Sequence, residues 1–271
     1  MLIKPILTKI TIYPIKSLDG IDLEKAQVTK GGCLLHDREF AIVDESGNFI
    51  NGKSTPRIHR LRSAVNFEHK TISFCGPDEE QWKQYHFAKE KQAIEAFLSS
   101  FFEKKAFLLQ DNTGRFMDVP DLSGVTIVST SSLNEVGSWY AGMGLEETRK
   151  RFRTTLEIEG VAPFWEDNLF ADQHSIVEFK IGEVTVHGMS PRARCIVPTR
   201  HPETGNVTRA FPKVFANKRA STLPSGSNLD LYGHYYYLTV DCLIPESEIG
   251  KNLIIGDELK ITGKRLLVET G

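Results

Sequence analysis

Cys195 is the residue of this sequence whose type and surroundings are best suited to chemistry. It lies within residues 190–205, SPRARCIVPTRHPETG, where Arg192 and Arg194 precede it. Neighbouring cations favour the thiolate over the thiol, and a thiolate is a soft donor that suits soft or sulfur-rich metal centres. A buried structural cysteine is the alternative at this position, and both interpretations stay open.

Positive charge is concentrated around this cysteine. Residues 190–219 hold seven Lys and Arg and a single acid, Glu203, which is a local charge of +6 on a chain whose net charge is −2. The RKRFR segment at residues 149–153 adds four cations. Such a concentration indicates an anion-binding site, although a solvated basic loop would produce the same pattern.

Two shorter motifs add groups that suit a phosphate or a polar heterocycle. In YPIKS, residues 13–17, a strand-like run ends at a proline and then offers the amine of Lys16 and the hydroxyl of Ser17. In HDR, residues 36–38, Arg38 opens a second strand-like run. Taken alone, the first motif is also compatible with a plain turn after a strand, and the second with a surface salt bridge.

Short strands must position these groups, because β-branched and alternating segments recur along the chain. A helix is expected over residues 94–102, where apolar side chains form one stripe, and a second helix is expected to begin at Ser132, which forms a capping box with Glu135. Many short strands and few helices indicate a mainly β (α+β), mostly antiparallel architecture, for which barrels are a common solution. The expected strands are residues 8–13, 38–43, 48–51, 61–67, 71–75, 106–109, 125–128, 156–159, 176–181, 184–187, 235–240 and 259–262.

Length and composition limit the class of protein. A chain of 271 residues with 40% hydrophobic residues is typical of a soluble globular protein, and loop-like residues 120–124 divide it into residues 1–120 and 121–271. A net charge of −2 argues against a chain built to coat nucleic acid. No apolar run is long enough for a signal peptide or a membrane span. We therefore expect a cytoplasmic protein without a membrane partner.

The four cysteines exclude several familiar sites. None of them forms a C-x-x-C pair, so a zinc ribbon, an iron–sulfur loop and a thioredoxin motif are not expected. Cys33, Cys75 and Cys242 lie in or beside strand-like segments without paired cations, and we expect them to be structural.

Taken together, the motifs carry a resemblance to a known family. In this order, YPIKS, HDR, RFR, PFWEDNLF, IGEV and RARCIVPTRHPETG resemble the MOSC family, named for the C-terminal domain of molybdenum cofactor sulfurases, preceded by its usual N-terminal β-barrel domain. The resemblance covers residues 10–262 and is most specific at Arg194-Cys195 and the PETG that follows. It implies two β-barrel-like domains with a few short helices, an N-terminal barrel in residues 1–120 and a MOSC barrel in residues 121–271. The nearest functional relatives would be amidoxime-reducing molybdoenzymes.

The resemblance also implies a molybdenum–molybdopterin cofactor (Moco). In the family, the dithiolene of the cofactor supplies two sulfurs to molybdenum and a protein cysteine supplies a third, so Cys195 would be both the metal ligand and the catalytic residue. Pyridoxal phosphate binding is a further property associated with the family. The phosphate and the pterin ring would be held by the matching positions Lys16, Ser17, Arg38 and Arg153. Arg194 would line the cofactor beside Cys195, and Tyr235 matches a tyrosine that faces the cofactor in the family.

Some residues depart from the family pattern. Thr155 stands where the family has an asparagine that would contact the pterin, and its hydroxyl has a shorter reach. His201 stands where the family often has an aspartate. Glu166 and Asp167 would form a charged wall near the substrate or orient Arg153, or else serve a structural turn. We favour the turn, because adjacent acids on a strand point to opposite faces.

The activity that the resemblance implies is reduction of a small N-oxygenated molecule, whose oxygen leaves as water. The chain has no flavin or nicotinamide fingerprint, so the electrons would come from a separate ferredoxin, cytochrome b5-like protein or flavoprotein. The alternative is a sulfur-carrier or cofactor-handling domain in which Cys195 holds a persulfide.

Two other classes are less well supported. An RNA-binding barrel would use the basic run, but that run lacks alternating aromatic and basic residues, so no nucleic-acid partner is expected. A cysteine hydrolase would require a histidine beside Cys195, which sequence spacing leaves open.

Overall fold

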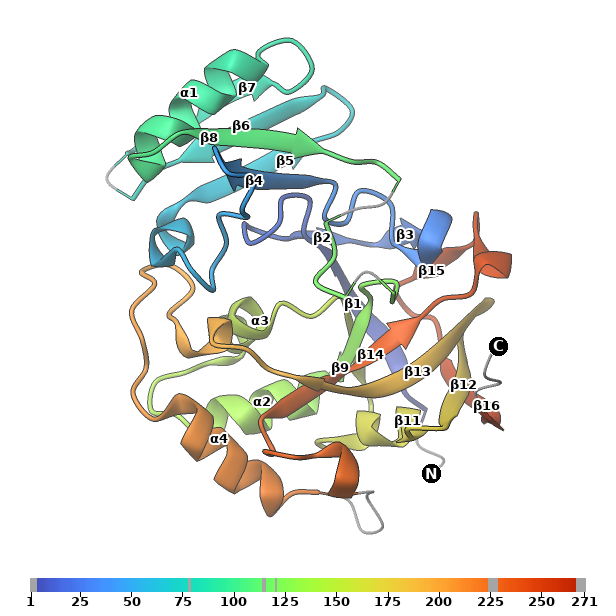
Figure 1. Cartoon of the computed structure of the whole chain (residues 1–271). Coiled ribbons are helices and arrows are strands. Elements are labelled where there is room, and N and C mark those ends of the chain that lie inside the picture. The colour runs from blue at the N-terminus through green and yellow to red at the C-terminus, as the bar shows by residue number, and fades with distance from the viewer. Residues whose placement is uncertain (1–3, 78, 114–115, 120, 224–228, 267–271) are drawn as a thin grey trace.

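The fold consists of β-sheets flanked by a few helices (Figure 1). The computed structural model describes residues 4–77, 79–113, 116–119, 121–223 and 229–266. Within them are sixteen strands and four α-helices, which confirms the mainly β prediction. None of the described helices is long and apolar enough to span a membrane. The helices are α1 (Lys91–Phe102), α2 (Thr130–Ser138), α3 (Leu145–Phe152) and α4 (Phe211–Ala220).

The largest sheet joins the beginning of the chain to its second half. Eight of its nine strands follow the order β11-β12-β13-β14-β9-β10-β1-β2, and the ninth, β16, pairs with β12. The predicted boundary at Pro120 falls on a residue outside the described part, and strands on both sides of it share this sheet. Its strands are β1 (Ile6–Ile12), β2 (Ile21–Leu23), β9 (Thr126–Ser129), β10 (Leu156–Glu159), β11 (Phe170–Asp172), β12 (Ser175–Ile181), β13 (Val184–Ala193), β14 (Tyr237–Leu243) and β16 (Leu259–Leu266).

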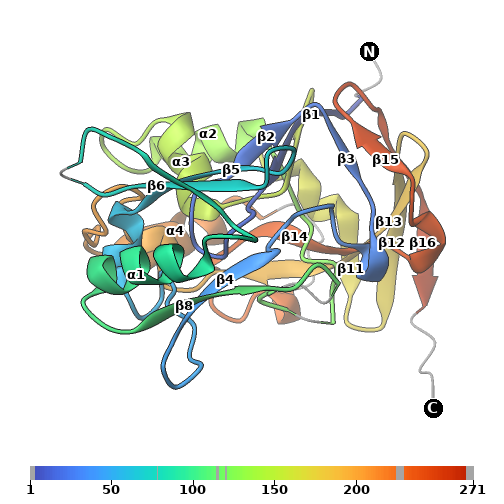
Figure 2. The same ribbon diagram turned by 90° about the horizontal axis from the view of Figure 1, so that it is seen from above.

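The remaining strands form smaller sheets. β4 (Phe40–Asp44) pairs with β8 (Ala106–Gln110), and β5 (Arg62–Asn66), β6 (Thr71–Cys75) and β7 (Lys83–His86) form a three-stranded sheet. α1 packs on this part of the chain, with Ile94 and Leu98 fully buried in its core. β3 (Lys25–Gln27) pairs with β15 (Asn252–Ile254), at the end of the molecule opposite α1 (Figure 2).

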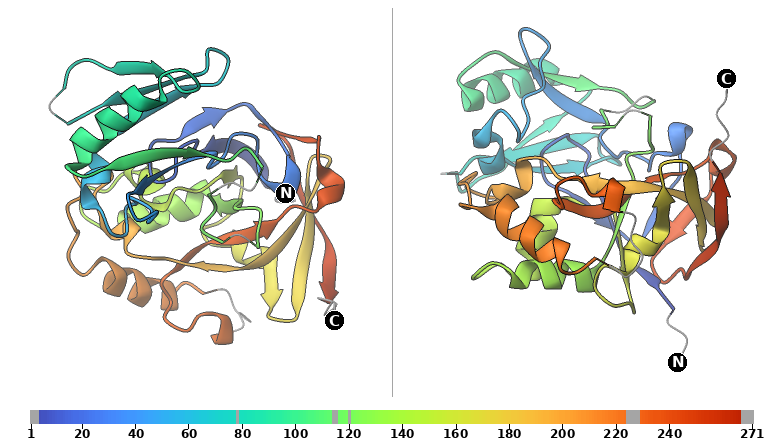
Figure 3. Two further views of the ribbon diagram at one scale, coloured as in Figure 1. Left: turned by 45° about the horizontal axis from the view of Figure 1, so that its top comes forward. Right: turned by 60° about the horizontal axis from the view of Figure 1, so that its bottom comes forward.

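The described strands pair in an antiparallel manner except β9 and β10, which are parallel. A parallel pair requires a crossover connection, and here α2 and α3 provide it. The two helices pack with α4 around Phe152, Phe211 and Phe215 in a core of their own. Figure 3 shows these helices on the side of the molecule away from β12 and β16.

Most predicted strands are present, but two local predictions are wrong and two helices were missed. Helix α2 begins at Thr130, because the Ser129 hydroxyl accepts the Ser132 N–H, while the Ser132 hydroxyl accepts the N–H of Phe164. Residues 48–51 form only an isolated bridge to β4 and not a strand. Helices α3 and α4 were not predicted. The buried face of α3 contains Arg151, whose charge hides the helical pattern of apolar residues.

Candidate functional site

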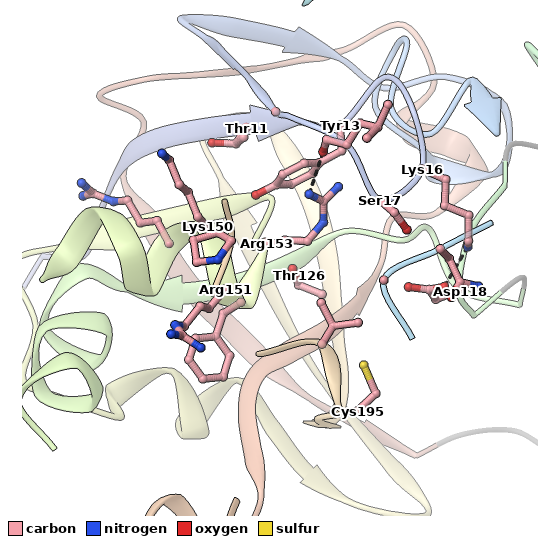
Figure 4. Close-up of a pocket in the computed structure, with 18 of the residues that line it drawn as sticks. Thr11, Tyr13, Lys16, Ser17, Asp118, Thr126, Lys150, Arg151, Arg153 and Cys195 are labelled. Carbon is pink, nitrogen blue, oxygen red and sulfur yellow. Dashed lines mark hydrogen bonds and ion pairs between the residues drawn. The ribbon is translucent and has the colours of Figure 1, made fainter. Parts of the chain in front are cut away.

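A cavity of about 650 Å³ lies between the smaller sheets and the large sheet. Its walls come from the loop after β1, from residues 51–62, from the segment before β9, from α3 and from the end of β13. Figure 4 shows side chains from these segments around one space. The predicted site residues that line it are Lys16, Ser17, Arg38, Arg153, Arg194 and Cys195.

Lys16 is held on the cavity wall by an acid that sequence analysis missed. Its Nζ lies 2.7 Å from Oδ1 of Asp118 and donates to the carbonyl of Phe116 at 2.8 Å. Burial lowers the pKa of Lys16, and Asp118 opposes this change. Burial would raise the pKa of Asp118, but Lys16, Lys53 and Arg38 outweigh it and hold that pKa well below its usual range. The Asp118 carboxyl is therefore ionised at neutral pH.

Tyr13 separates the two arginines predicted to bind the cofactor. Its ring centroid lies 4.1 Å from the guanidinium carbon of Arg153 and 4.9 Å from that of Arg38. Both distances are within the range of a cation–π contact. Burial raises the pKa of Tyr13 to about 12, so the phenol stays protonated and its ring remains a neutral platform.

Each of these two arginine side chains is held by a different partner. Arg38 is paired with the fully buried Asp37, which also accepts the N–H of Tyr13 at 2.8 Å. Arg153 donates to the carbonyl of Leu18 at 2.6 Å and has no acidic partner among the described residues. Burial lowers the pKa of Arg153, because no nearby acid fully compensates for desolvation. A bound anion would supply that compensation.

Four predicted cofactor ligands have a backbone conformation that non-glycine residues rarely adopt. Ser17, Arg38 and Arg153, which line the cavity, have φ values of 71°, 50° and 51°, and Tyr235, which is not part of the cavity wall, has a φ of 56°. Each such residue costs about 1–3 kcal/mol and persists only where the surrounding structure enforces it. Such residues cluster at binding sites, so this backbone geometry supports a functional role for the loops that carry them.

Cys195 follows the end of β13 and is an exposed free thiol at the cavity. Beside it, Arg194 donates to the carbonyl of Phe152 at 2.7 Å, and its buried Nε has no partner among the described residues. Burial and the neighbouring Arg192 lower the pKa of Arg194 to about 10, so it remains charged at neutral pH. Arg192 is itself paired with Asp241.

Residues 51–62 and the loop after Cys195 add a second cationic wall, which contains Lys53, His59 and Arg200. Burial is the main cause that lowers the pKa of His59 to about 4, and Arg153 and Arg200 add to it. His59 is therefore neutral at pH 7. Neither Lys53 nor Arg200 has an acidic ion-pair partner in the described ranges.

Two family models together match almost the whole chain. The MOSC N-terminal beta barrel domain matches residues 4–119, and the MOSC domain matches residues 119–260. The chain belongs to the MOSC family. The family resemblance inferred from the motifs is thereby confirmed.

Named relatives of this MOSC protein are distant. It is 23% identical to Mitochondrial amidoxime reducing component 2 of Macaca fascicularis, over 84% of this chain and 77% of that protein. It is 24% identical to Mitochondrial amidoxime-reducing component 1 of Mus musculus, over 84% and 76%. It is 20% identical to Molybdenum cofactor sulfurase of Oryza sativa subsp. japonica, over 75% of this chain and 29% of that protein.

The fold does not bring two predicted cofactor-binding residues of this MOSC protein to the cavity. Thr155 is not part of the cavity wall, and its N–H donates to the hydroxyl of Thr126, which is. Tyr235 packs against the core of the large sheet. Tyr235 has a left-handed backbone conformation, with a φ of 56°, and the backbone carbonyl of its neighbour Tyr236 accepts the N–H of Arg194 at 2.9 Å.

Asp167 has the structural role that we favoured, whereas both carboxylate oxygens of the buried Glu166 have no hydrogen-bond partner among the described residues. Both acids lie in a short 3-10 helix, Trp165–Leu169, and neither lines the cavity. Asp167 is paired with Arg219, whose side chain is 2% exposed. The reason differs from the one we gave, since the two acids lie on a helical turn and not on a strand. Cys33, Cys75 and Cys242 are buried, as expected of structural cysteines.

Proposed function

We propose that this MOSC protein binds a molybdenum–molybdopterin cofactor and acts as an oxidoreductase on small N-oxygenated molecules. The observation that carries the proposal is that Cys195 opens into the same cavity as Lys16, Arg38, Arg153 and Arg194. These residues come from separate segments of the chain and line one cavity, which a solvated basic loop does not explain.

The residues present fit such a cofactor. Its phosphate needs cations, and Arg153 and Arg194 are half-buried cations without an acidic partner among the described residues. Its metal needs a soft ligand, which the Cys195 thiol provides. The described part contains no group of three His, Cys, Asp or Glu side chains able to hold a metal. A metal at Cys195 would therefore take its other ligands from the cofactor.

Each residue of the site has a defined role in this proposal. When bound, the cofactor supplies two-electron redox chemistry at molybdenum. Cys195 binds the metal through its sulfur, and Lys16, Arg38 and Arg153 bind the phosphate and pterin end. Arg194 keeps a positive charge beside Cys195, where it would offset the negative charge of a metal-bound sulfur. Tyr13 orients the two flanking arginines.

The reaction class rests on the relatives. Two of them are named as amidoxime-reducing components, although the identities are only 23% and 24%. We propose the same class of substrate here, with electrons from a separate donor protein.

Metal and pterin content test the proposal. The protein is produced in a host that makes molybdopterin, and molybdenum and the fluorescent oxidation product of the pterin are measured. We expect stoichiometric molybdenum, reduction of benzamidoxime with a chemical reductant, and loss of both molybdenum and activity in Cys195→Ala. Cys33→Ser, which alters a buried thiol outside the cavity, serves as the control. A folded protein that carries neither pterin nor molybdenum would contradict the proposal.

A second candidate is a sulfur carrier, which the similarity to a molybdenum cofactor sulfurase favours. In that case Cys195 holds a persulfide and the purified protein contains no molybdenum. Cyanide-labile sulfur that is lost in Cys195→Ala would distinguish this function from the first.

A further inference from the structure

Two segments poor in acidic residues lie side by side on one edge of the molecule. Residues 47–66 contain four Lys and Arg and no acid, and residues 190–219 contain seven with a single acid. The segments touch, because a Cβ at Gly205 would lie 2.6 Å from the carbonyl oxygen of Pro56. The loop that follows Cys195 and the start of α4 continue along the left edge of Figure 1. The fold thus joins two basic stretches into one surface.

Several of these cations form no ion pair within the described part of the chain. Lys53, Arg209 and Lys213 are exposed and have no acidic ion-pair partner in the part of the chain that the structure describes. Arg209 and Lys213 also lie outside the wall of the cavity. Lys213 stands in the first turn of α4, which contains no acid. A cation is unfavourable there because the helix N-terminus carries positive partial charge, so helix stability does not explain this residue.

Exposed apolar side chains belong to the same loop. Ile196 is 48% exposed and Val207 is 55% exposed, and the strand bridge between Arg200 and Val207 folds this loop back on itself. Ile196 directly follows Cys195, so the outer surface and the proposed metal ligand are one residue apart. We call Lys53, Ile196, Val207, Arg209 and Lys213 the basic face; the nearby Arg57 is paired with Glu103 at 2.7 Å and is not counted.

We propose that the basic face docks an acidic one-electron carrier protein that reduces the site at Cys195. The proposal rests on the proposed function, which needs a separate electron donor. Small apolar patches bordered by one sign of charge suit a partner of opposite charge, because complementary fields raise the rate of encounter. Docking here brings the partner's redox centre close to Cys195, and electron transfer is faster over shorter distances.

The overall reaction balances with this partner. Two reduced carrier molecules each give up one electron and are oxidised. These electrons and two protons from solvent break the N–O bond of an N-hydroxylated substrate. One proton joins the leaving hydroxyl to form water, and the other binds to the nitrogen. No other reductant is needed.

Charge reversal on the basic face tests the proposal in the full-length, cofactor-loaded protein. The variant is Arg209→Glu/Lys213→Glu, neither residue of which belongs to the proposed cofactor site. The control is Lys25→Glu/Lys180→Glu, with the same change of charge on exposed residues of β3 and β12 at the far end. Benzamidoxime reduction is driven in parallel by reduced methyl viologen, by a reduced plant-type ferredoxin and by a reduced soluble cytochrome b5 domain.

We expect at least one of the two acidic carriers to support turnover that falls as salt is added. That rate should decrease about 10-fold or more in the basic-face variant and less than about twofold in the control. The viologen-driven rate should stay within about twofold in both variants. Since it requires no docking, a viologen-driven rate of zero in the unaltered protein would contradict the proposed function itself.

Two results would overturn the docking proposal alone. One is normal viologen-driven turnover together with carrier-driven rates that are absent or equal in both variants. The other is salt-sensitive binding of a single-stranded RNA that the basic-face variant loses while carrier-driven rates stay unchanged, which would assign this face to nucleic acid.

Discussion

Oδ1 of Asp118 lies 2.7 Å from Nζ of Lys16, although 102 residues separate the two in the sequence. The pair places a carboxylate against a cation that we assign to the phosphate of the cofactor. Any anion that binds Lys16 must therefore share it with Asp118. This relationship makes the anion affinity of the site adjustable by one residue that no sequence motif had indicated.

Removing the Asp118 charge should strengthen anion binding. Asp118→Asn frees Lys16 and removes a repulsive carboxylate, so we expect the dissociation constant of the cofactor-free protein for inorganic phosphate to fall about 5- to 10-fold. Isothermal titration calorimetry measures it. The matched control is Asp172→Asn, which breaks the Asp172–Lys264 pair, 2.8 Å long and outside the cavity. Unchanged phosphate affinity in Asp118→Asn would show that Lys16 does not bind the anion.

The ring of Tyr13 should be needed for cofactor retention, whereas its hydroxyl should not. Tyr13→Leu removes two cation–π contacts, each of about 0.5–2 kcal/mol, and lets Arg38 and Arg153 move. We expect the pterin content of purified protein to fall several-fold. Tyr13→Phe keeps the ring and should retain most of the cofactor. Equal pterin content in both variants would exclude Tyr13 as a positioning residue.

Glu166 should make the protein less stable as pH rises. Burial is the main cause that raises its pKa from 4.5 to about 7, and Asp167 adds to the shift. Between these values the folded state binds more protons than the unfolded state, so stability falls as pH rises from about 4.5 to 7 and stays reduced above it. The loss amounts to about 3 kcal/mol.

Urea unfolding at several pH values tests this effect. Glu166→Gln should lose the decrease between pH 5 and 7 and unfold at higher urea concentration than the unaltered protein at pH 8. Glu248→Gln is a control of opposite sign, because hydrogen bonds and Lys251 lower the pKa of Glu248 against its burial. A pH profile that is the same with and without Glu166 would contradict the prediction.

Arg219 should matter for stability and not for the site. Its guanidinium carbon lies 4.2 Å from the centroid of Phe164, and it is the buried partner of Asp167. Arg219→Met leaves that carboxylate buried and unpaired, so we expect a loss of about 3–5 kcal/mol in the free energy of unfolding. The protein that remains folded should carry its normal share of cofactor. A loss of cofactor without a loss of stability would place Arg219 in the binding site.

The chain's local patterns determined the mainly β class, the basic surroundings of Cys195 and the motifs shared with the MOSC family. These features are readable because strand alternation and motif spacing involve neighbouring residues. Strands β6 and β10 begin and end where their alternation predicted. Helix α3 was missed, because Arg151 is buried on its inner face, where an apolar residue is expected.

Only the tertiary structure decided which residues meet at the cavity. Asp118 reaches Lys16, Tyr13 separates Arg38 from Arg153, and the backbone carbonyl of Tyr236 accepts the N–H of Arg194. The reason is physical. An ion pair or a ring contact between residues far apart in the sequence depends on the path of the whole chain, whereas strand alternation and motif spacing involve only neighbouring residues.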